Sequence, residues 1–224
     1  MKTYSLDREF FLIKIFRFLF GSVRDSRERA KVKSFSEFGI TLFCGRQGDG
    51  KTISMVHRLE LYRHKYPKAL IYTNFGYKYQ TGALTNWNQI LTLKNGTDGI
   101  IFAIDEIQNE FDVYAARGFD VSILRLITQQ RKQAIKILGT AQVFTRVTKP
   151  LREQTFDVVE CRTFGGRWTF QKAFDAFEYS NVVDSMVGKD KLRRLWRRNF
   201  VQTDELRSLF DSYAVIQSLQ KIST

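Results

Sequence analysis

A glycine-rich stretch near the start of the chain has the residue types and spacing of a phosphate-binding loop, G-x-x-x-x-G-K-[ST]. Glycines let backbone N–H groups turn inward around phosphates, and the positive end of the following helix attracts the same charge. Lys51 is predicted to reach the β- and γ-phosphates as a binding and catalytic residue, and Thr52 to hold Mg²⁺. The expected ligand is ATP with Mg²⁺, bound by Gly45, Arg46, Gln47, Gly48, Asp49, Gly50, Lys51 and Thr52.

A second group of chemically active residues, Asp105 and Glu106, follows the apolar run 99–104. The run predicts a buried parallel strand with both carboxylates at its carboxyl end. In a protein with a phosphate loop, Asp105 is expected behind Mg²⁺ as its second protein ligand. Glu106 is expected to orient or deprotonate the attacking water. A second carboxylate at this place favours an ATP-hydrolysing machine over a small-molecule kinase.

A third candidate residue is Gln142, which stands just after the apolar stretch 135–140. Ligands of parallel α/β sheets bind at the carboxyl ends of the strands, so Gln142 is predicted to sense the γ-phosphate or the attacking water through its amide. The two histidines, His57 and His64, do not suggest a metal site. They are expected to be surface or packing residues.

The elements that would position these residues alternate between strand and helix from residue 38 onward. The expected strands are 38–44, 69–73, 99–104, 135–140 and 156–163. The expected helices are 51–64, 85–93 and 119–132. This alternation predicts an α/β fold in which helices cover both faces of a mostly parallel sheet. Gly165 and Gly166 predict a hairpin that adds antiparallel strands at the edge.

Three regions are expected along the chain: 1–34 with an apolar helix and a basic connector, 35–180 with the ATPase core, and 181–224 with a basic segment and a C-terminal helix. The apolar residues 10–20 form only about 16 Å of helix, short of the roughly 30 Å core of a bilayer. Lys14 and Arg17 fall on one face of this helix. The pattern fits a helix lying in a membrane surface, docking on a membrane protein, or packing on its own domain or a neighbouring subunit.

The chain is strongly basic, with 36 Lys and Arg against 23 Asp and Glu, a net charge of +13 and a pI near 9.8. This excess predicts a polyanionic partner, either nucleic acid or an anionic membrane face. The densest basic stretch, 189–198, could bind DNA phosphate with Trp196 alongside. Alternatively, it could form a solvated face with Leu192, Leu195 and Trp196 buried at helical spacing. The two cysteines are too few for a disulfide framework or a four-ligand zinc site.

Taken with these motifs, the sequence resembles the FtsK–HerA superfamily of DNA-pumping P-loop motors. Members carry an arginine, a short apolar strand and then a Thr-Gln or similar pair, and the spacing from Arg131 to Gln142 is similar here. Within the superfamily the chain looks most like the Zot-like and viral genome-packaging ATPases. The runs that carry this finer resemblance are 105–108, 149–153 and 200–206.

The resemblance implies a RecA-like fold and active sites that lie between the subunits of a ring, hexameric or of another size. In such a ring an arginine of one subunit stabilises the transition-state charge on its neighbour's nucleotide. By the family's position Arg131 is the expected catalytic arginine, and Arg146 and Arg152 are alternatives.

The resemblance also implies ATP-driven translocation of double-stranded DNA, as in the genome packaging of tectivirus-like phages, with other packaging-vertex proteins as partners. The alternative is a membrane-attached Zot-like morphogenesis or secretion ATPase that acts on proteins. Zot-like assembly proteins of filamentous phages carry a transmembrane helix after the core, and no later apolar stretch here approaches about 20 residues. Both functions place the chain in the host cytoplasm, virion-associated or peripheral on a membrane. A nucleotide kinase is a third, weaker hypothesis.

Overall fold

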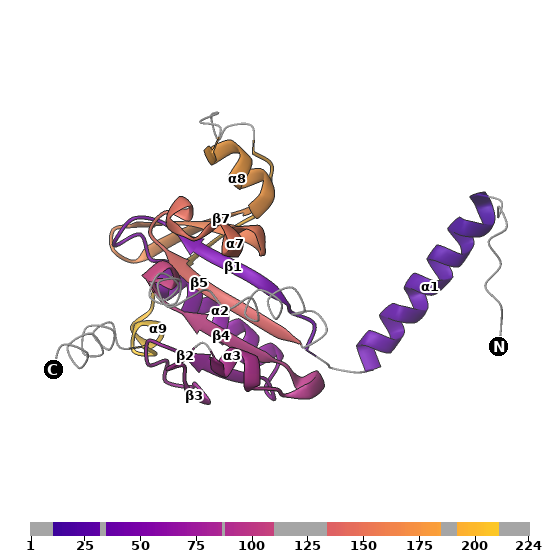
Figure 1. Cartoon of the computed structure of the whole chain (residues 1–224), viewed down its shortest axis with the longest axis horizontal. Helices are drawn as coiled ribbons and strands as arrows, with labels where there is room; N and C mark the ends of the chain where they lie inside the picture. Colours follow the sequence, from indigo (N-terminus) through magenta and orange to yellow (C-terminus); the bar gives the residue numbers. More distant parts are fainter. Residues whose placement is uncertain (1–10, 32–34, 87, 110–133, 185–191, 211–224) are drawn as a thin grey trace. The chain divides into compact units, whose positions relative to one another are not determined.

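The computed structural model describes residues 11–31, 35–86, 88–109, 134–184 and 192–210. Contacts divide the chain into two units, Met1–Ser34 and Phe35–Thr224 (Figure 1), and each unit is considered by itself. The predicted helix 119–132 lies outside the described residues.

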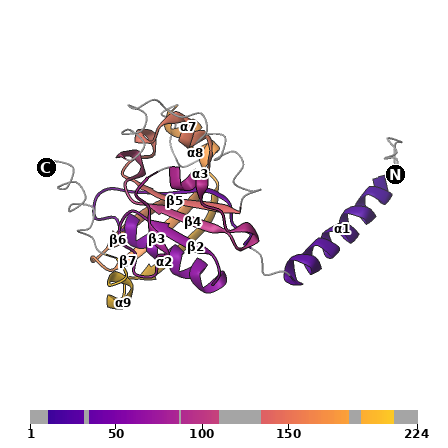
Figure 2. The same ribbon diagram turned by 60° about the horizontal axis from the view of Figure 1, so that its bottom comes forward.

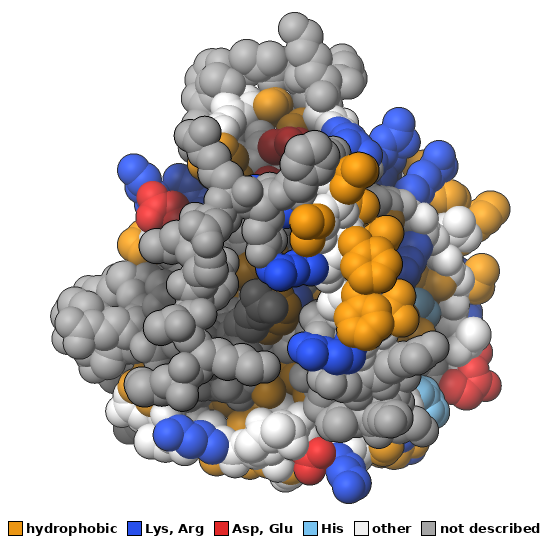
Figure 3. Space-filling view, turned by 90° about the vertical axis from the view of Figure 1, so that its right-hand side faces the viewer, with side chains coloured by type: hydrophobic (Ala, Val, Ile, Leu, Met, Phe, Trp, Pro, Cys, Tyr) orange, Lys and Arg blue, Asp and Glu red, His pale blue; other side chains and the backbone are white. Residues whose placement is uncertain are grey.

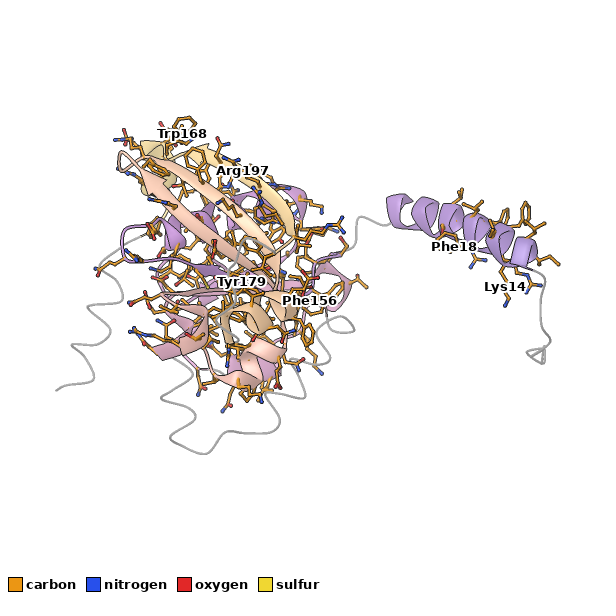
Figure 4. All side chains as sticks on the ribbon, turned by 90° about the horizontal axis from the view of Figure 1, so that it is seen from above. Lys14, Phe18, Phe156, Trp168, Tyr179 and Arg197 are labelled. Carbon is orange, nitrogen blue, oxygen red and sulfur yellow. The ribbon has the colours of Figure 1, made fainter. Side chains whose placement is uncertain are left out.

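The described part of the first unit is a single helix, α1 (Phe11–Lys31), so the predicted N-terminal helix is present. Large apolar side chains dominate its first half, and Phe16 and Phe18 are each 70% exposed. Lys14 and Phe18 (Figure 4) lie four residues apart and therefore on the same helical face. No helix in the described part of the chain is long and apolar enough to cross a membrane.

The second unit is built on a sheet whose described strands have the order β3-β2-β4-β5-β1-β6-β7-β8. Pairing is parallel from β3 through β6 and antiparallel from β6 to β8, which confirms the predicted parallel sheet with an antiparallel edge hairpin. The strands are β1 (Gly39–Cys44), β2 (Leu70–Thr73), β3 (Gly82–Ala83), β4 (Ile100–Ile104), β5 (Ile135–Ala141), β6 (Thr155–Phe164), β7 (Trp168–Asp175) and β8 (Arg194–Val201).

Helices cover both faces of this sheet (Figure 2), as the alternation of elements predicts. Helix α2 packs on one face, and α3, α7 and α8 pack on the other. The central strands β1, β4 and β5 are therefore buried along their whole length, which explains their continuous apolar sequences. The helices are α2 (Lys51–Lys65), α3 (Asn88–Thr92), α7 (Lys149–Glu153), α8 (Ala176–Asp184) and α9 (Asp204–Arg207), with short 3₁₀ turns at Gly96–Asp98 and Phe144–Arg146.

The last strand, β8, corrects one sequence-based alternative. A helical spacing of buried Leu192, Leu195 and Trp196 is wrong for residues 194–201, because they form a strand paired with β7. Leu195 is 53% exposed, whereas Trp196 on the opposite face packs into the core cluster around α2. β8 thus brings part of the predicted segment 181–224 into the sheet of the core.

Candidate functional site

The phosphate loop lies between β1 and α2, in the strand–loop–helix arrangement that the motif requires. Gly48 and Gly50 have φ angles of +84° and +80°, in the left-handed region that favours glycine. The Asp49 carboxylate accepts a hydrogen bond of 2.7 Å from the backbone N–H of Arg46, which closes the loop on itself. Lys51 is buried and its Nζ donates to the Arg46 carbonyl oxygen over 3.3 Å. The loop therefore has the curled backbone and internal lysine of a phosphate cradle.

The residues predicted to hold Mg²⁺ are brought together at the carboxyl end of β4. The hydroxyl of Thr52 donates to Oδ1 of Asp105 over 3.0 Å, although the two residues come from different elements. A carboxylate and a hydroxyl oxygen at the mouth of a phosphate loop fit the oxygen ligands that Mg²⁺ takes together with nucleotide phosphates. Thr52 and Asp105 are thus the residues that would hold the ion.

Two further residues orient Asp105, and the sequence analysis missed both. Thr140, at the end of β5, donates from its hydroxyl to Oδ1 of Asp105 over 2.5 Å. Asn74, which follows β2, accepts from the backbone N–H of Asp105 over 2.8 Å and donates to its carbonyl oxygen over 3.1 Å. Both follow the rule that polar residues at the carboxyl ends of parallel strands meet at one edge of the sheet, which was the available signal.

Glu106 has an unusual backbone conformation, with a φ of +50° in the left-handed region. Such a residue persists only where its surroundings determine it. Its backbone N–H donates to the Thr140 hydroxyl over 2.8 Å, and Gln108 donates from its amide to the Glu106 carboxylate. As a result the Glu106 carboxylate stands 4.0 Å from Nζ of Lys51, the residue that the loop motif assigns to the β- and γ-phosphates. This is the place from which a base can act on an attacking water.

One open cleft of about 730 Å³ is lined by Lys51, Thr52, Asp105 and Glu106, and also by residues from later in the chain. Gln202, just after β8, is buried and donates to the Thr169 hydroxyl over 2.8 Å. Thr169 hydrogen-bonds to Thr163 over 2.9 Å, and Thr163 donates to the Asp49 carbonyl oxygen over 3.1 Å. A chain of polar contacts therefore supports the phosphate loop from the β6–β7 hairpin. The run 200–206, which contains Gln202, carries part of the family resemblance, but no motif predicted this supporting role.

We expect Gln202→Ala to lower the free energy of unfolding by about 1–3 kcal/mol, since it removes the bond to the buried Thr169 hydroxyl and the bonds that the Gln202 amide oxygen accepts from Arg207. Chemical denaturation monitored by circular dichroism measures this change. Val201→Ala is the matched control, because Val201 is the preceding residue and is 59% exposed. Equal stability of the two variants would contradict a structural role for the Gln202 contacts.

Gln142 is not among the described residues that line this cleft. It lines a second cavity of about 580 Å³, together with Arg46 and Asp49 on the other side of the phosphate loop. Its side-chain oxygen accepts a hydrogen bond of 3.4 Å from Arg146. The residue of β5 that reaches Asp105 is instead Thr140, two positions earlier. The sensing role of Gln142 stays a prediction.

The candidate catalytic arginines are also placed away from the cleft of their own chain, as far as the structure describes them. Arg131 lies outside the described residues. Arg146 contacts Gln142, and Arg152 lies 5.7 Å from the ring of Phe144. An arginine that acts on a neighbouring subunit's nucleotide does not need to reach its own.

The histidines and cysteines take no part in the chemistry of the cleft. His57 stacks on Phe200 with ring centroids 4.2 Å apart, and burial lowers its pKa, so the prediction of a packing role is confirmed for this residue. Burial raises the pKa of the Cys161 thiol to about 12, which keeps it protonated near neutral pH.

The fold and the site together define the class of protein: a P-loop NTPase. No protein-family model matches the chain, and no curated protein matches it. Among solved structures, the chain is similar to the N-terminal domain of zonular occludens toxin from Neisseria meningitidis, with a TM-score of 0.54 and 17% sequence identity. The match covers 77% of this chain and 98% of that domain. It shows a shared fold and so confirms, for the fold, the predicted resemblance to Zot-like P-loop ATPases.

A second solved structure matches less closely. The genome packaging NTPase B204 from Sulfolobus turreted icosahedral virus 2, in complex with AMPPCP, has a TM-score of 0.47 and 12% identity. That match covers 62% of this chain and 93% of the viral protein.

Proposed function

We propose that this chain hydrolyses ATP and uses the energy to move double-stranded DNA, in the packaging of a viral genome into a capsid. The observation that best supports ATP hydrolysis is the position of Glu106. Its backbone is held in a left-handed conformation, and its carboxylate lies 4.0 Å from Nζ of Lys51. A protein that only bound a nucleotide would have no use for a constrained second carboxylate at this place.

The predicted site residues of the cleft have separate tasks in the proposed reaction. The N–H groups of the loop and the ammonium of Lys51 hold the β- and γ-phosphates. Glu106 aims the attacking water and accepts its proton, while Thr140 and Gln108 keep its backbone and carboxylate in place. Mg²⁺ held by Thr52 and Asp105 would neutralise charge on the phosphate oxygens.

The DNA part of the proposal is supported by charge and by the sequence resemblance. The net charge of +13 supplies the attraction for phosphate that a sequence-independent pump needs. Among the described residues drawn in Figure 3, Lys and Arg side chains are more prominent than Asp and Glu. β8 adds the exposed Arg194 at the edge of the sheet.

The proposed motor is a ring of identical subunits, hexameric or of another size, located in the host cytoplasm, on the virion or on a membrane surface. Arg131, Arg146 and Arg152 are the candidates for the arginine that reaches the neighbouring nucleotide. Packaging-vertex proteins are the proposed further partners.

We expect long double-stranded DNA to stimulate ATP hydrolysis by the full chain several-fold. Phosphate release is measured with and without the DNA, and Lys51→Ala and Glu106→Gln serve as controls that abolish both rates. Steep loss of the stimulation with added salt is expected, because the contacts are to phosphate. Hydrolysis that is indifferent to DNA would overturn the packaging function and leave the ATPase in place.

One observation favours a second candidate function, a membrane-attached Zot-like morphogenesis ATPase that acts on proteins. The apolar side chains of α1 are exposed, with Leu12 at 67% and Phe20 at 68%. An exposed apolar helix that carries Lys14 and Arg17 is suited to a membrane surface or a membrane-protein partner. Removal of residues 1–22 would then abolish vesicle binding, and DNA would have no effect on hydrolysis.

A further inference from the structure

The antiparallel strands β6, β7 and β8 form a small sheet whose two faces differ. One face packs against α2 and the phosphate loop, through Val159, Ala173 and Trp196 in the core and Thr163 and Thr169 under the loop. The side chains at the alternate positions point to the other face. That other face is not needed by the site described above.

The strand register sets the side chains of this other face in rows across three strands. Lys172 stands opposite Arg197 on β8, and Phe170 stands opposite Arg162 on β6. In the last row, Phe164 on β6 stands opposite Trp168 on β7. We call this surface the aromatic face and define it by Phe164, Trp168, Phe170, Arg162, Lys172 and Arg197.

The aromatic residues of this face touch one another and remain accessible. The rings of Trp168 and Phe170 lie 4.9 Å apart, and those of Phe164 and Phe170 lie 5.6 Å apart. Phe164 is 50% exposed and Trp168 is 51% exposed, so large ring surfaces meet solvent at the end of the hairpin. Trp168 is also oriented by a hydrogen bond of 3.1 Å from Nε1 to the side chain of Asn199. These are oriented rings on a strand framework.

Cations surround the rings on the same face. The Arg162 guanidinium lies 5.0 Å from the centroid of the Phe164 ring. Arg162, Lys172 and Arg197 also line the second cavity, which continues from Phe164 and Phe170 to Arg46 of the phosphate loop. Two carboxylates, Asp49 and Glu160, line it as well, and Glu160 accepts a hydrogen bond of 2.8 Å from Tyr179. The lining of the cavity therefore has an excess of positive charge, from Arg46, Arg162, Lys172 and Arg197.

We propose that the aromatic face binds single-stranded nucleic acid. Stacking rings beside a basic groove are the two features that hold single strands without sequence preference, because every base has a π-face and every nucleotide a phosphate. A duplex hides its base faces in the stack. It can therefore gain from the positive charge of this face but not from stacking on Phe164 and Trp168. The face lies across the sheet from the residues that support the phosphate loop. The proposal rests on the rings and cations of this face and does not depend on the proposed motor.

The test is fluorescence anisotropy of a labelled oligothymidine with the full chain, in the absence of ATP, compared with the same strand in a duplex. We expect tighter binding of the single strand. Trp168→Ala should weaken it by about 5- to 150-fold, the equivalent of 1–3 kcal/mol for one stacked base. Phe177→Ala is the control, because Phe177 is 76% exposed on α8 and lies outside the aromatic face.

Arg197 and Arg198 provide a second matched pair, since neighbouring residues of a strand point to opposite faces. Arg197→Ala is expected to weaken binding and to reduce its salt dependence by about one phosphate contact, and Arg198→Ala to do neither. Equal binding of single strand and duplex, or equal effects within each pair of variants, would overturn the proposal. So would a change in oligomeric state of Trp168→Ala, seen by analytical ultracentrifugation, without a change in oligonucleotide binding.

Because no ATP is present, this measurement is independent of hydrolysis. If duplex DNA did not stimulate ATP hydrolysis by the full chain but oligothymidine still bound, the motor would be rejected and the aromatic face kept. The reverse result would reject the aromatic face alone.

Discussion

Replacing Glu106 with glutamine is expected to lower the rate of ATP hydrolysis by about 10²–10⁴-fold while ATP still binds, because the amide cannot accept a proton from water. The substitution keeps the size of the side chain. It also keeps the bond from the Glu106 backbone N–H to Thr140, which does not involve the side chain. Phosphate release gives the rate, and titration with a fluorescent ATP analogue gives the affinity.

The control for this variant is Glu153→Gln, which changes an exposed glutamate of α7 whose side chain is 60% accessible. It should hydrolyse ATP at the unaltered rate. A Glu106→Gln chain that still hydrolyses ATP at more than a tenth of that rate would assign the proton transfer to another group.

The parts of the site that could be predicted are those in which local sequence determines local structure. The glycines of the phosphate loop and the apolar run before Asp105 each specify a backbone shape within a few residues. The carboxyl ends of β1 and β4 then lie at the same edge of the sheet, with β5 between them, because the three strands are parallel. For this reason Lys51, Thr52, Asp105 and Glu106 come together as expected.

The parts that could not be predicted depend on strand order and register. Thr140 faces Asp105 because β5 lies next to β4. Gln142, two residues later and just beyond β5, was predicted at the nucleotide instead. Gln202 is distant in sequence, and only the pairing of β8 with β7 brings it beneath the loop. Its neighbours Thr163 and Thr169 are ordinary strand residues in the sequence.

The same register explains why the hairpin matters to both proposals. On one face of β6 and β7, Thr163 and Thr169 lie under Gly50 of the phosphate loop. On the other face, the adjacent Phe164 and Trp168 belong to the aromatic face. Nucleic acid bound on that face would lie across the sheet from Thr163 and Thr169, and the cavity on the same face reaches Arg46 of the phosphate loop.

We expect Gly50→Ala to abolish ATP binding and to reduce hydrolysis by at least about 100-fold, the loss that a misplacement of 1 Å can produce. A Cβ at this position would lie 2.4 Å from the Thr163 hydroxyl and 3.2 Å from that of Thr169, so the loop and the hairpin would have to separate. Isothermal titration with ATP and Mg²⁺ measures the binding.

The matched control is Gly48→Ala, because it separates strain from collision. Gly48 has almost the same φ as Gly50, +84° against +80°, yet an added Cβ there meets no other protein atom within 4 Å. Both variants carry the left-handed strain of about 1–2 kcal/mol, and only Gly50→Ala adds the overlap with Thr163. Gly48→Ala should therefore lose some stability but bind ATP more tightly than Gly50→Ala does. If both variants lost binding equally, backbone conformation alone would determine the loop, and contact with the hairpin would have no part in holding the nucleotide.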